Sequence, residues 1–143
     1  MRFGDCDPAG IVYTPRFAEF VVSAMELFIG GLFGQTLRAV SKELGFGTPV
    51  KALSFVFTSA LAPDDEFDLV VTVADIRRSS FDLAMTATTT AGRLAFEATI
   101  SPICVPWRGE RRSIAIPPPL RERLEAYREE VSGRTQGCGN RVP

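Results

Sequence analysis

Apolar residues recur at three- and four-residue steps between residues 15 and 31, a spacing typical of a helix that buries one face. They are Phe17, Phe20, Val21, Ala24, Leu27, Phe28 and Gly31. Thr14 is the expected N-cap and Pro15 the expected first helical residue, and a run of glycines marks the end. A second, shorter helix is predicted over residues 36–44, with Gly45 as its C-terminal stop.

Beyond Pro49 the spacing of apolar residues changes from helical to alternating, which predicts strands with one buried face. The alternating sets are Leu53, Phe55 and Phe57; Phe67, Leu69, Val71 and Val73; Phe81, Leu83, Met85 and Ala87; and Leu94, Phe96, Ala98 and Ile100. Four consecutive strands with short connections predict an antiparallel sheet with one packed face. The long N-terminal helix is the natural cover for that face, so the fold class is α+β.

Length and composition predict one domain. A chain of 143 residues that is 45% hydrophobic can bury a core without disulfides or metals. The domain is expected to span residues 1–131, ending in a surface helix that begins near Leu120. Residues 132–143 contain few apolar side chains and are predicted to be a disordered tail.

The charge balance argues against nucleic acid or a membrane as partner. Lys and Arg number 16 against 17 Asp and Glu, a net charge of -1. No apolar run reaches the ~18 residues of a membrane span, and no signal-peptide pattern follows Met1. The three cysteines, Cys6, Cys104 and Cys138, are widely spaced without metal-ligand spacing, so we expect no metal site and a reducing, cytoplasmic location.

The histidine count is zero, which excludes several kinds of catalytic site. Ser-His-Asp and Cys-His nucleophiles, histidine general bases and histidine metal sites all require that residue. If the chain is an enzyme, carboxylates are therefore the leading candidates for acid-base chemistry.

Two carboxylates stand close together just before the long predicted helix, in the stretch RFGDCDPAGIVYTPRF. Asp7 precedes the expected N-cap by about seven residues, so the loop between them can return its carboxylate to the helix start. The first helical amides are unpaired donors at the positive end of the helix dipole and would polarise a carbonyl placed there. A carboxylate nearby could attack that carbonyl or activate water. The alternative is that Asp5 and Asp7 supply only turn and cap chemistry.

The segments FGDCDPAGIVYTPRF, GFGTPV and IRRSSF resemble the 4-hydroxybenzoyl-CoA thioesterase family of the hotdog fold, over roughly residues 2–116. The resemblance implies an antiparallel sheet wrapped around a long central helix. It implies that Asp7 is catalytic, as nucleophile or general base, and that the amide of Thr14 is the oxyanion donor, with Tyr13 at the pocket wall. Asp5 would then brace the loop. No cofactor is implied.

The same resemblance assigns substrate-binding residues. Arg77 matches a position that contacts the nucleotide of coenzyme A in the family, and Arg78 follows it. Ser79 replaces a lysine of a relative. Thr48, in the GFGTPV segment, also falls within the implied site. Val22 stands where an acidic residue of the 4-hydroxybenzoyl enzyme reads the substrate hydroxyl, a role that valine cannot fill.

The implied assembly is a dimer in which two sheets join edge to edge, usually paired again into a tetramer, with active sites at the subunit interface. Only six residues precede Asp7, so the first strand of the fold is expected to be short or to begin upstream. The interpretation is an acyl-CoA thioesterase acting on an aryl, benzoyl-type ester. The alternatives are a thioesterase for aliphatic acyl-CoA or acyl carrier protein esters, and a non-catalytic acyl-CoA-binding module.

Overall fold

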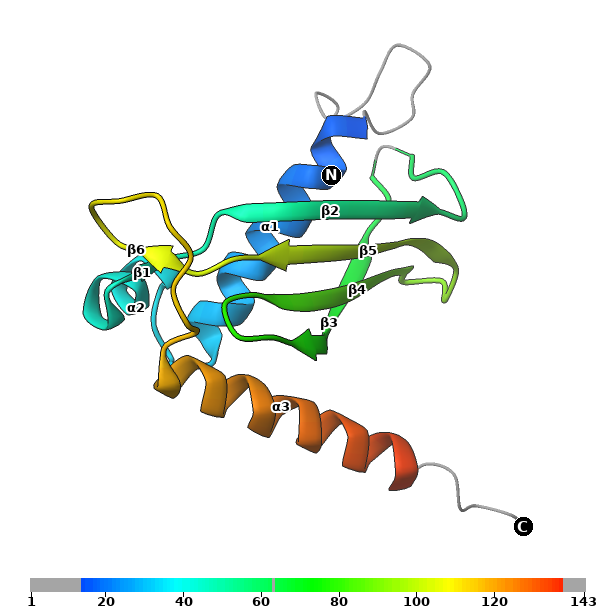
Figure 1. The fold of residues 1–143 in the computed structure, drawn as a ribbon. Helices are drawn as coiled ribbons and strands as arrows, with labels where there is room; N and C mark the ends of the chain where they lie inside the picture. Colours follow the sequence, from blue (N-terminus) through cyan, green and yellow to red (C-terminus); the bar gives the residue numbers. More distant parts are fainter. Residues whose placement is uncertain (1–13, 63, 138–143) are drawn as a thin grey trace.

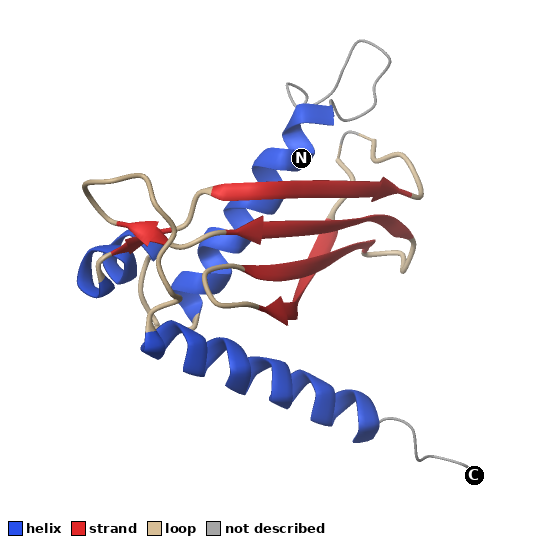
Figure 2. Ribbon diagram, in the orientation of Figure 1, coloured by secondary structure: helices blue, strands red, loops and turns tan. Residues whose placement is uncertain are grey.

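A computed structural model gives the arrangement of residues 14–62 and 64–137 (Figure 1). An antiparallel four-stranded sheet has one long helix across one face and another along one edge (Figure 2). The elements in chain order are α1 Thr14–Gly31, α2 Leu37–Leu44, β1 Phe46–Gly47, β2 Val50–Phe57, β3 Phe67–Ile76, β4 Phe81–Thr89, β5 Leu94–Pro102, β6 Val105–Pro106 and α3 Pro118–Gly137. The predicted α+β class and antiparallel sheet are confirmed.

Helix α1 buries one narrow stripe against the sheet. Phe17, Val21, Met25 and Ile29 follow one another at four-residue steps and are all buried. Leu27, which the helical spacing assigns to this stripe, is instead 77% exposed, because it lies two residues from both Met25 and Ile29 and so on another face of the helix. The broad apolar pattern predicted the helix correctly but overestimated its buried width.

The end of α1 is set by a close approach of the backbone. A side chain at Gly30 would meet the carbonyl oxygen of Gln35, and its Cβ would lie 2.9 Å from the amide nitrogen of Leu37. The amide of Gln35 also donates to the carbonyl of Gly30 at 3.0 Å. The chain therefore folds back tightly into α2 at this point, and glycine is the residue that permits it.

Helix α2 is capped at both ends: Gly45 is the predicted C-terminal stop, whereas Thr36, expected as the first helical residue, is the N-cap. The Oγ1 atom of Thr36 accepts a hydrogen bond from the amide of Ala39 at 3.2 Å. Gly45 adopts the left-handed conformation with φ of 74°, and its amide donates to the carbonyl of Ser41 at 2.9 Å.

The four strands are ordered β2-β5-β4-β3. Strands β3, β4 and β5 follow one another as hairpins, whereas β2 pairs with β5, so residues 58–66 carry the chain across the sheet from one edge to the other. A two-residue ladder joins β1 to β6 and was not predicted, because two residues are too few to show a period.

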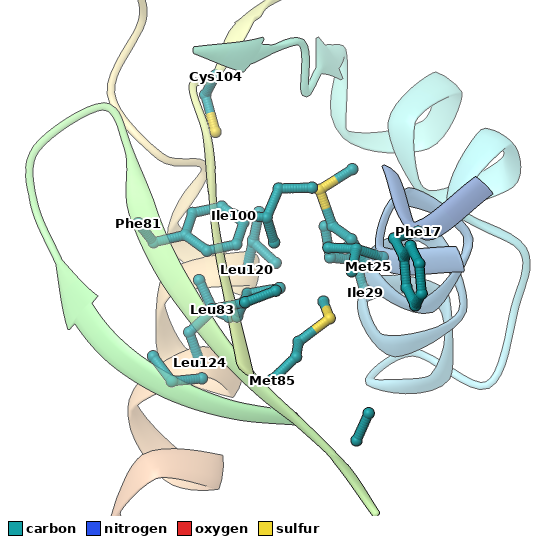
Figure 3. Close-up of a cluster of buried hydrophobic side chains, with 14 of the residues drawn as sticks. Phe17, Met25, Ile29, Phe81, Leu83, Met85, Ile100, Cys104, Leu120 and Leu124 are labelled. Atoms are coloured by element: carbon teal, nitrogen blue, oxygen red, sulfur yellow. The ribbon is translucent and has the colours of Figure 1, made fainter. Parts of the chain in front are cut away.

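The core lies between α1 and the sheet and is extended by side chains from the start of α3 (Figure 3). The Phe17 ring packs edge-on against Phe96 with 5.1 Å between ring centroids, and Phe20 packs against Phe67 at 5.7 Å. In the outer strand β2, by contrast, Leu53 is 36% and Phe57 48% exposed. These two side chains follow the predicted alternation but are only partly covered.

Helix α3 is longer than the sequence predicts. It runs to Gly137, six residues beyond the expected domain boundary at residue 131, so residues 132–137 are helical rather than part of a disordered tail. Arg134 forms an i,i+4 ion pair with Glu130 at 2.5 Å, which supports the helix here without apolar contacts. Residues 138–143 lie outside the described part. Of the helices in residues 14–62 and 64–137, none is long and apolar enough to cross a membrane.

Candidate functional site

The start of α1 lies over one end of the sheet. The helix begins at Thr14, and one turn later the Phe17 ring packs against Phe57 at the end of β2, with 4.9 Å between centroids. The amides of a first helical turn have no acceptor within the helix itself, so a helix start of this kind can polarise a carbonyl group placed there. Asp5, Asp7 and Tyr13 lie outside the described residues, so their roles stay predictions.

The two other implied acyl-site residues have different surroundings. Val22 is half-buried and packs against the hydrophobic core. Thr48 is also half-buried, but it lines an open hollow of about 590 Å³ between α1, α2 and the segment after β6. The structure therefore does not bring Val22 and Thr48 into one pocket within the described chain.

Apolar side chains dominate the exposed wall of this hollow. Leu27 of α1 and Trp107 after β6 are 77% and 36% exposed, and Leu37 of α2 is also part of the lining. Ser23 and Glu26 add polar groups from α1. A volume of this size suits a drug-sized or acyl group. The sequence did not indicate the hollow, because Leu27 resembled a core residue and Trp107 a loop residue.

The predicted arginines occupy the turn between β3 and β4. The guanidinium of Arg77 donates to Asp82 from Nη2 at 2.5 Å and from Nη1 at 3.0 Å. Nη1 also donates to Asp75 at 2.9 Å, and Nε donates to the Oγ atom of Ser80 at 3.0 Å. Arg77 is thus held by three neighbouring side chains.

Asp82 is the centre of this polar cluster on the outer face of the sheet. Its Oδ1 atom also accepts from the hydroxyl of Ser101 at 2.6 Å. The hydrogen bond from Arg77 lowers the pKa of Asp82 below its ordinary value, although burial opposes that shift. The hydrogen bond to Asp82 likewise raises the pKa of Arg77. Asp82 was not predicted, although an aspartate between Phe81 and Leu83 in an alternating strand must point away from the core.

Arg78 differs from Arg77 because its side chain is exposed and forms no hydrogen bond or ion pair with any of the described residues. Only its main chain is held: its carbonyl accepts from the amide of Ile116 at 2.8 Å and from Arg121 of α3 at 3.5 Å. The guanidinium of Arg78 therefore remains available to a ligand.

The helix start and the arginine turn lie at opposite ends of the sheet. Phe67, which packs against Phe20 near the start of α1, begins β3, and Ile76, next to Arg77, ends it. Nine strand steps of about 3.3 Å separate these ends by roughly 30 Å. Within one chain, the predicted catalytic and nucleotide-binding residues are therefore far apart.

The arrangement of a long helix across an antiparallel sheet is the hotdog fold, the class that solved thioesterase structures share with this chain. Residues 1–124 match the Thioesterase-like superfamily, and the chain belongs to that family.

A relative and several solved structures refine this placement. The chain is 30% identical to 4-hydroxybenzoyl-CoA thioesterase from Pseudomonas sp. (strain CBS-3) over 82 residues, 57% of this chain and 58% of the relative, so the match spans little more than half of that protein. The solved structure of the same thioesterase is 28% identical, with a TM-score of 0.77 over 86% of this chain and 94% of the other.

Two further structures are similar. A mutant of 4-hydroxybenzoyl-CoA thioesterase complexed with 4-hydroxybenzoyl-CoA is 27% identical, with a TM-score of 0.78 over 87% of this chain and 93% of the other. A gentisyl-coenzyme A thioesterase is 21% identical, with a TM-score of 0.76 over 87% of this chain and 94% of the other, and supports the fold alone.

Proposed function

We propose that the protein is an acyl-CoA thioesterase that hydrolyses an aryl, benzoyl-type CoA thioester to the carboxylate and free coenzyme A. The observation that carries the proposal is that α1 begins at Thr14, directly after the family-like segment containing Asp7. Its first amides can hold the thioester oxygen, with the Thr14 amide as donor and Tyr13 beside it. Membership of the superfamily and the relatives named above support the same reaction.

Asp7 supplies the reactive carboxylate in either of two routes. As nucleophile, its oxygen attacks the thioester carbon, the C–S bond breaks, and water then cleaves the mixed anhydride. As general base, it takes a proton from the water that attacks the same carbon, and the thiolate leaves with a proton. In both routes the negative oxygen forms at the helix start, where removal of one donor typically costs ~3 kcal/mol of transition-state stabilisation.

The working unit in this proposal is at least a dimer, joined through β2. The Phe57 end of strand β2 packs against the first turn of α1. The Val50 end of β2 pairs with Pro102, at the end of the sheet that carries Arg77 and Arg78. A two-fold axis would pair two β2 strands antiparallel and set the helix start of one protomer beside the arginine turn of its partner. The distance of roughly 30 Å within one chain would then no longer separate the two halves of the site.

The deciding experiment replaces the carboxylate without changing its shape. Asp7→Asn should abolish thiol release from benzoyl-CoA while circular dichroism and oligomeric state stay as in the parent. Asp5→Asn is the matched control and should lose far less activity. Turnover by Asp7→Asn comparable to that of the parent would contradict the mechanism.

A panel of thioesters tests the acyl group. It contains benzoyl-CoA, 4-hydroxybenzoyl-CoA, an aliphatic acyl-CoA and an acyl carrier protein thioester. We expect benzoyl-CoA to be hydrolysed at least as well as its hydroxylated form, since Val22 cannot pair with a hydroxyl. A preference for the aliphatic or carrier protein ester would reassign the substrate, and hydrolysis of none would favour a non-catalytic binding module.

A further inference from the structure

The turn at residues 77–80 is anchored through all four of its carbonyl groups. The carbonyl of Ser80 accepts from the amide of Arg77 at 2.8 Å, and that of Ser79 accepts from Cys104 at 2.7 Å. The carbonyl of Arg78 accepts from Ile116 at 2.8 Å, and that of Arg77 accepts from the guanidinium of Arg121. Three residues from other parts of the chain, Cys104, Ile116 and Arg121, thus hold the turn in place.

The same turn carries hydrogen-bond donors that have no acceptor among the described residues. Among the residues that the structure describes, neither the amide of Arg78 nor that of Ser79 donates to an acceptor. The Arg78 side chain in the same turn is exposed. Together these groups give the turn one full positive charge and two N–H donors without an acceptor among the described residues, a combination that suits a phosphate group.

Arg77 lacks these properties although it is the neighbouring residue. Four hydrogen bonds already use its Nε, Nη1 and Nη2 atoms, and two carboxylates, Asp75 and Asp82, surround its single positive charge. One N–H of Nη2 remains, but a phosphate that approached it would be repelled by both carboxylates.

We infer that Arg77 and Asp82 are positioning residues that fix the β3–β4 turn, and that the exposed Arg78, with the turn amides, contacts the phosphate groups of coenzyme A. This inference rests on the proposed function and deepens it. It reverses the order in which the family resemblance ranks the two arginines. Ser101 supports the pair by donating to the same carboxylate oxygen of Asp82 that receives Nη2 of Arg77.

The direction in which one substitution changes the affinity for coenzyme A distinguishes the two possible roles of Arg77. Asp82→Asn keeps the shape of the side chain but removes its charge. If Arg77 contacted phosphate, this change would free the guanidinium and tighten coenzyme A binding. If Arg77 positions the turn, the same change loosens it and weakens binding through Arg78.

The experiment measures dissociation constants for coenzyme A and for pantetheine, which lacks the nucleotide phosphates, by titration calorimetry. We expect Arg78→Ala to weaken coenzyme A binding by ~10-fold or more, as for a lost charge-assisted hydrogen bond, and to leave pantetheine binding unchanged. Asp82→Asn and Arg77→Lys should each weaken coenzyme A binding by a smaller factor. Arg134→Ala, in the last turn of α3, is the control for loss of a surface arginine and should change neither constant.

Tighter coenzyme A binding by Asp82→Asn would overturn the inference, and so would unchanged binding by Arg78→Ala or failure of the parent to bind coenzyme A. Circular dichroism of each variant checks that the fold persists. Because coenzyme A is the product of the proposed reaction, its binding does not depend on turnover. If the parent binds coenzyme A through Arg78 but releases no thiol, only the proposed function is refuted. If the parent is active and Arg78→Ala binds coenzyme A as tightly as the parent does, only the inference is refuted.

Discussion

The two edge strands of the sheet, β3 and β2, differ in how they are covered. At the β3 edge, α3 packs along the strand, and the hydroxyl of Tyr127 donates to the outward carbonyl of Val71 at 2.7 Å. The Tyr127 ring also packs edge-on against Phe28 of α1, with 4.9 Å between centroids. At the β2 edge no described element covers the strand, and Val56 is 63% exposed. Among residues 14–62 and 64–137, the chain therefore protects one edge and leaves the other open.

This difference supports association through β2 rather than through β3. An open strand edge is a template for pairing with another chain, and proteins normally cover or charge it unless it is used. The β2 sequence, VKALSFVF, contains one charge and five large apolar residues, and Val56 and Phe57 among them are 63% and 48% exposed. Such a strand is poorly suited to permanent exposure.

The hydrogen bonds of β2 identify which amides face the open edge. The amide of Thr58 donates to Ala95 on β5 at 2.9 Å, one residue after the pair Phe57 and Phe96. In an antiparallel ladder the amides point to alternate sides, so those of Phe57, Phe55 and Leu53 face away from β5. These are the donors that a partner strand would use.

The largest expected effect comes from blocking the open edge. Leu53→Pro removes an outward amide but no bond to β5, so the fold should persist while the dimer dissociates. If the site needs both protomers, thiol release should fall at least about 100-fold, since displacement of substrate-positioning groups has effects of that size. Sedimentation equilibrium and a thiol-release assay measure the two results.

The matched control is Ser54→Pro, which removes an inward amide and should destabilise the subunit itself. A Leu53→Pro protein that keeps both the oligomeric state and the activity of the parent would show that β2 is not the interface.

At the covered edge we expect loss of stability without dissociation. Tyr127→Ala removes a half-buried ring and the hydrogen bond to Val71 and should lower the unfolding free energy by ~2–3 kcal/mol. Tyr127→Phe removes the hydrogen bond alone and should lower it by about 1 kcal/mol. Urea denaturation measures both, and dissociation of either variant at equal protein concentration would contradict the distinction between the edges.

The smallest effect concerns pH and the ion pair at the end of the covered edge. Because Arg77 lowers the pKa of Asp82 in the folded state, the pair stabilises the fold above the ordinary aspartate pKa of about 3.9 and loses that effect as pH falls. The difference in unfolding free energy between the parent and Asp82→Asn should be constant near neutral pH and shrink below about pH 4. A difference that grew on acidification would contradict the assigned pair.

Local sequence patterns predicted the helices and strands better than they predicted side-chain burial and the pairing of distant strands. The long helix, the stop at Gly45 and the four alternating strands each depend on residues close in sequence, and the structure confirms them. Whether Leu27 is buried depends instead on how α1 meets the sheet, which its apolar character does not reveal. The crossing of residues 58–66 between the sheet edges likewise depends on long-range pairing.

For the candidate site, the sequence predicted residues but not the neighbours that the fold gives them. The position of Asp7 before a helix suggested a chemistry, and the family resemblance implied roles for Asp7 and for the arginine pair. The partner of Arg77 did not emerge, because Asp75 and Asp82 become its neighbours only when β3 and β4 form a hairpin. The family resemblance singled out both arginines, but their separate environments required the structure.

The close turn at Gly30 has a consequence for tolerance to substitution. Gly30 and Gly31 are adjacent and look interchangeable in the sequence, yet a Cβ atom at Gly31 would meet nothing within 4 Å. At Gly30 it would strike backbone atoms of the segment leading into α2, which a side-chain rearrangement cannot relieve. In a library of random variants selected for folded protein, position 31 should therefore accept many residues, whereas position 30 should stay glycine.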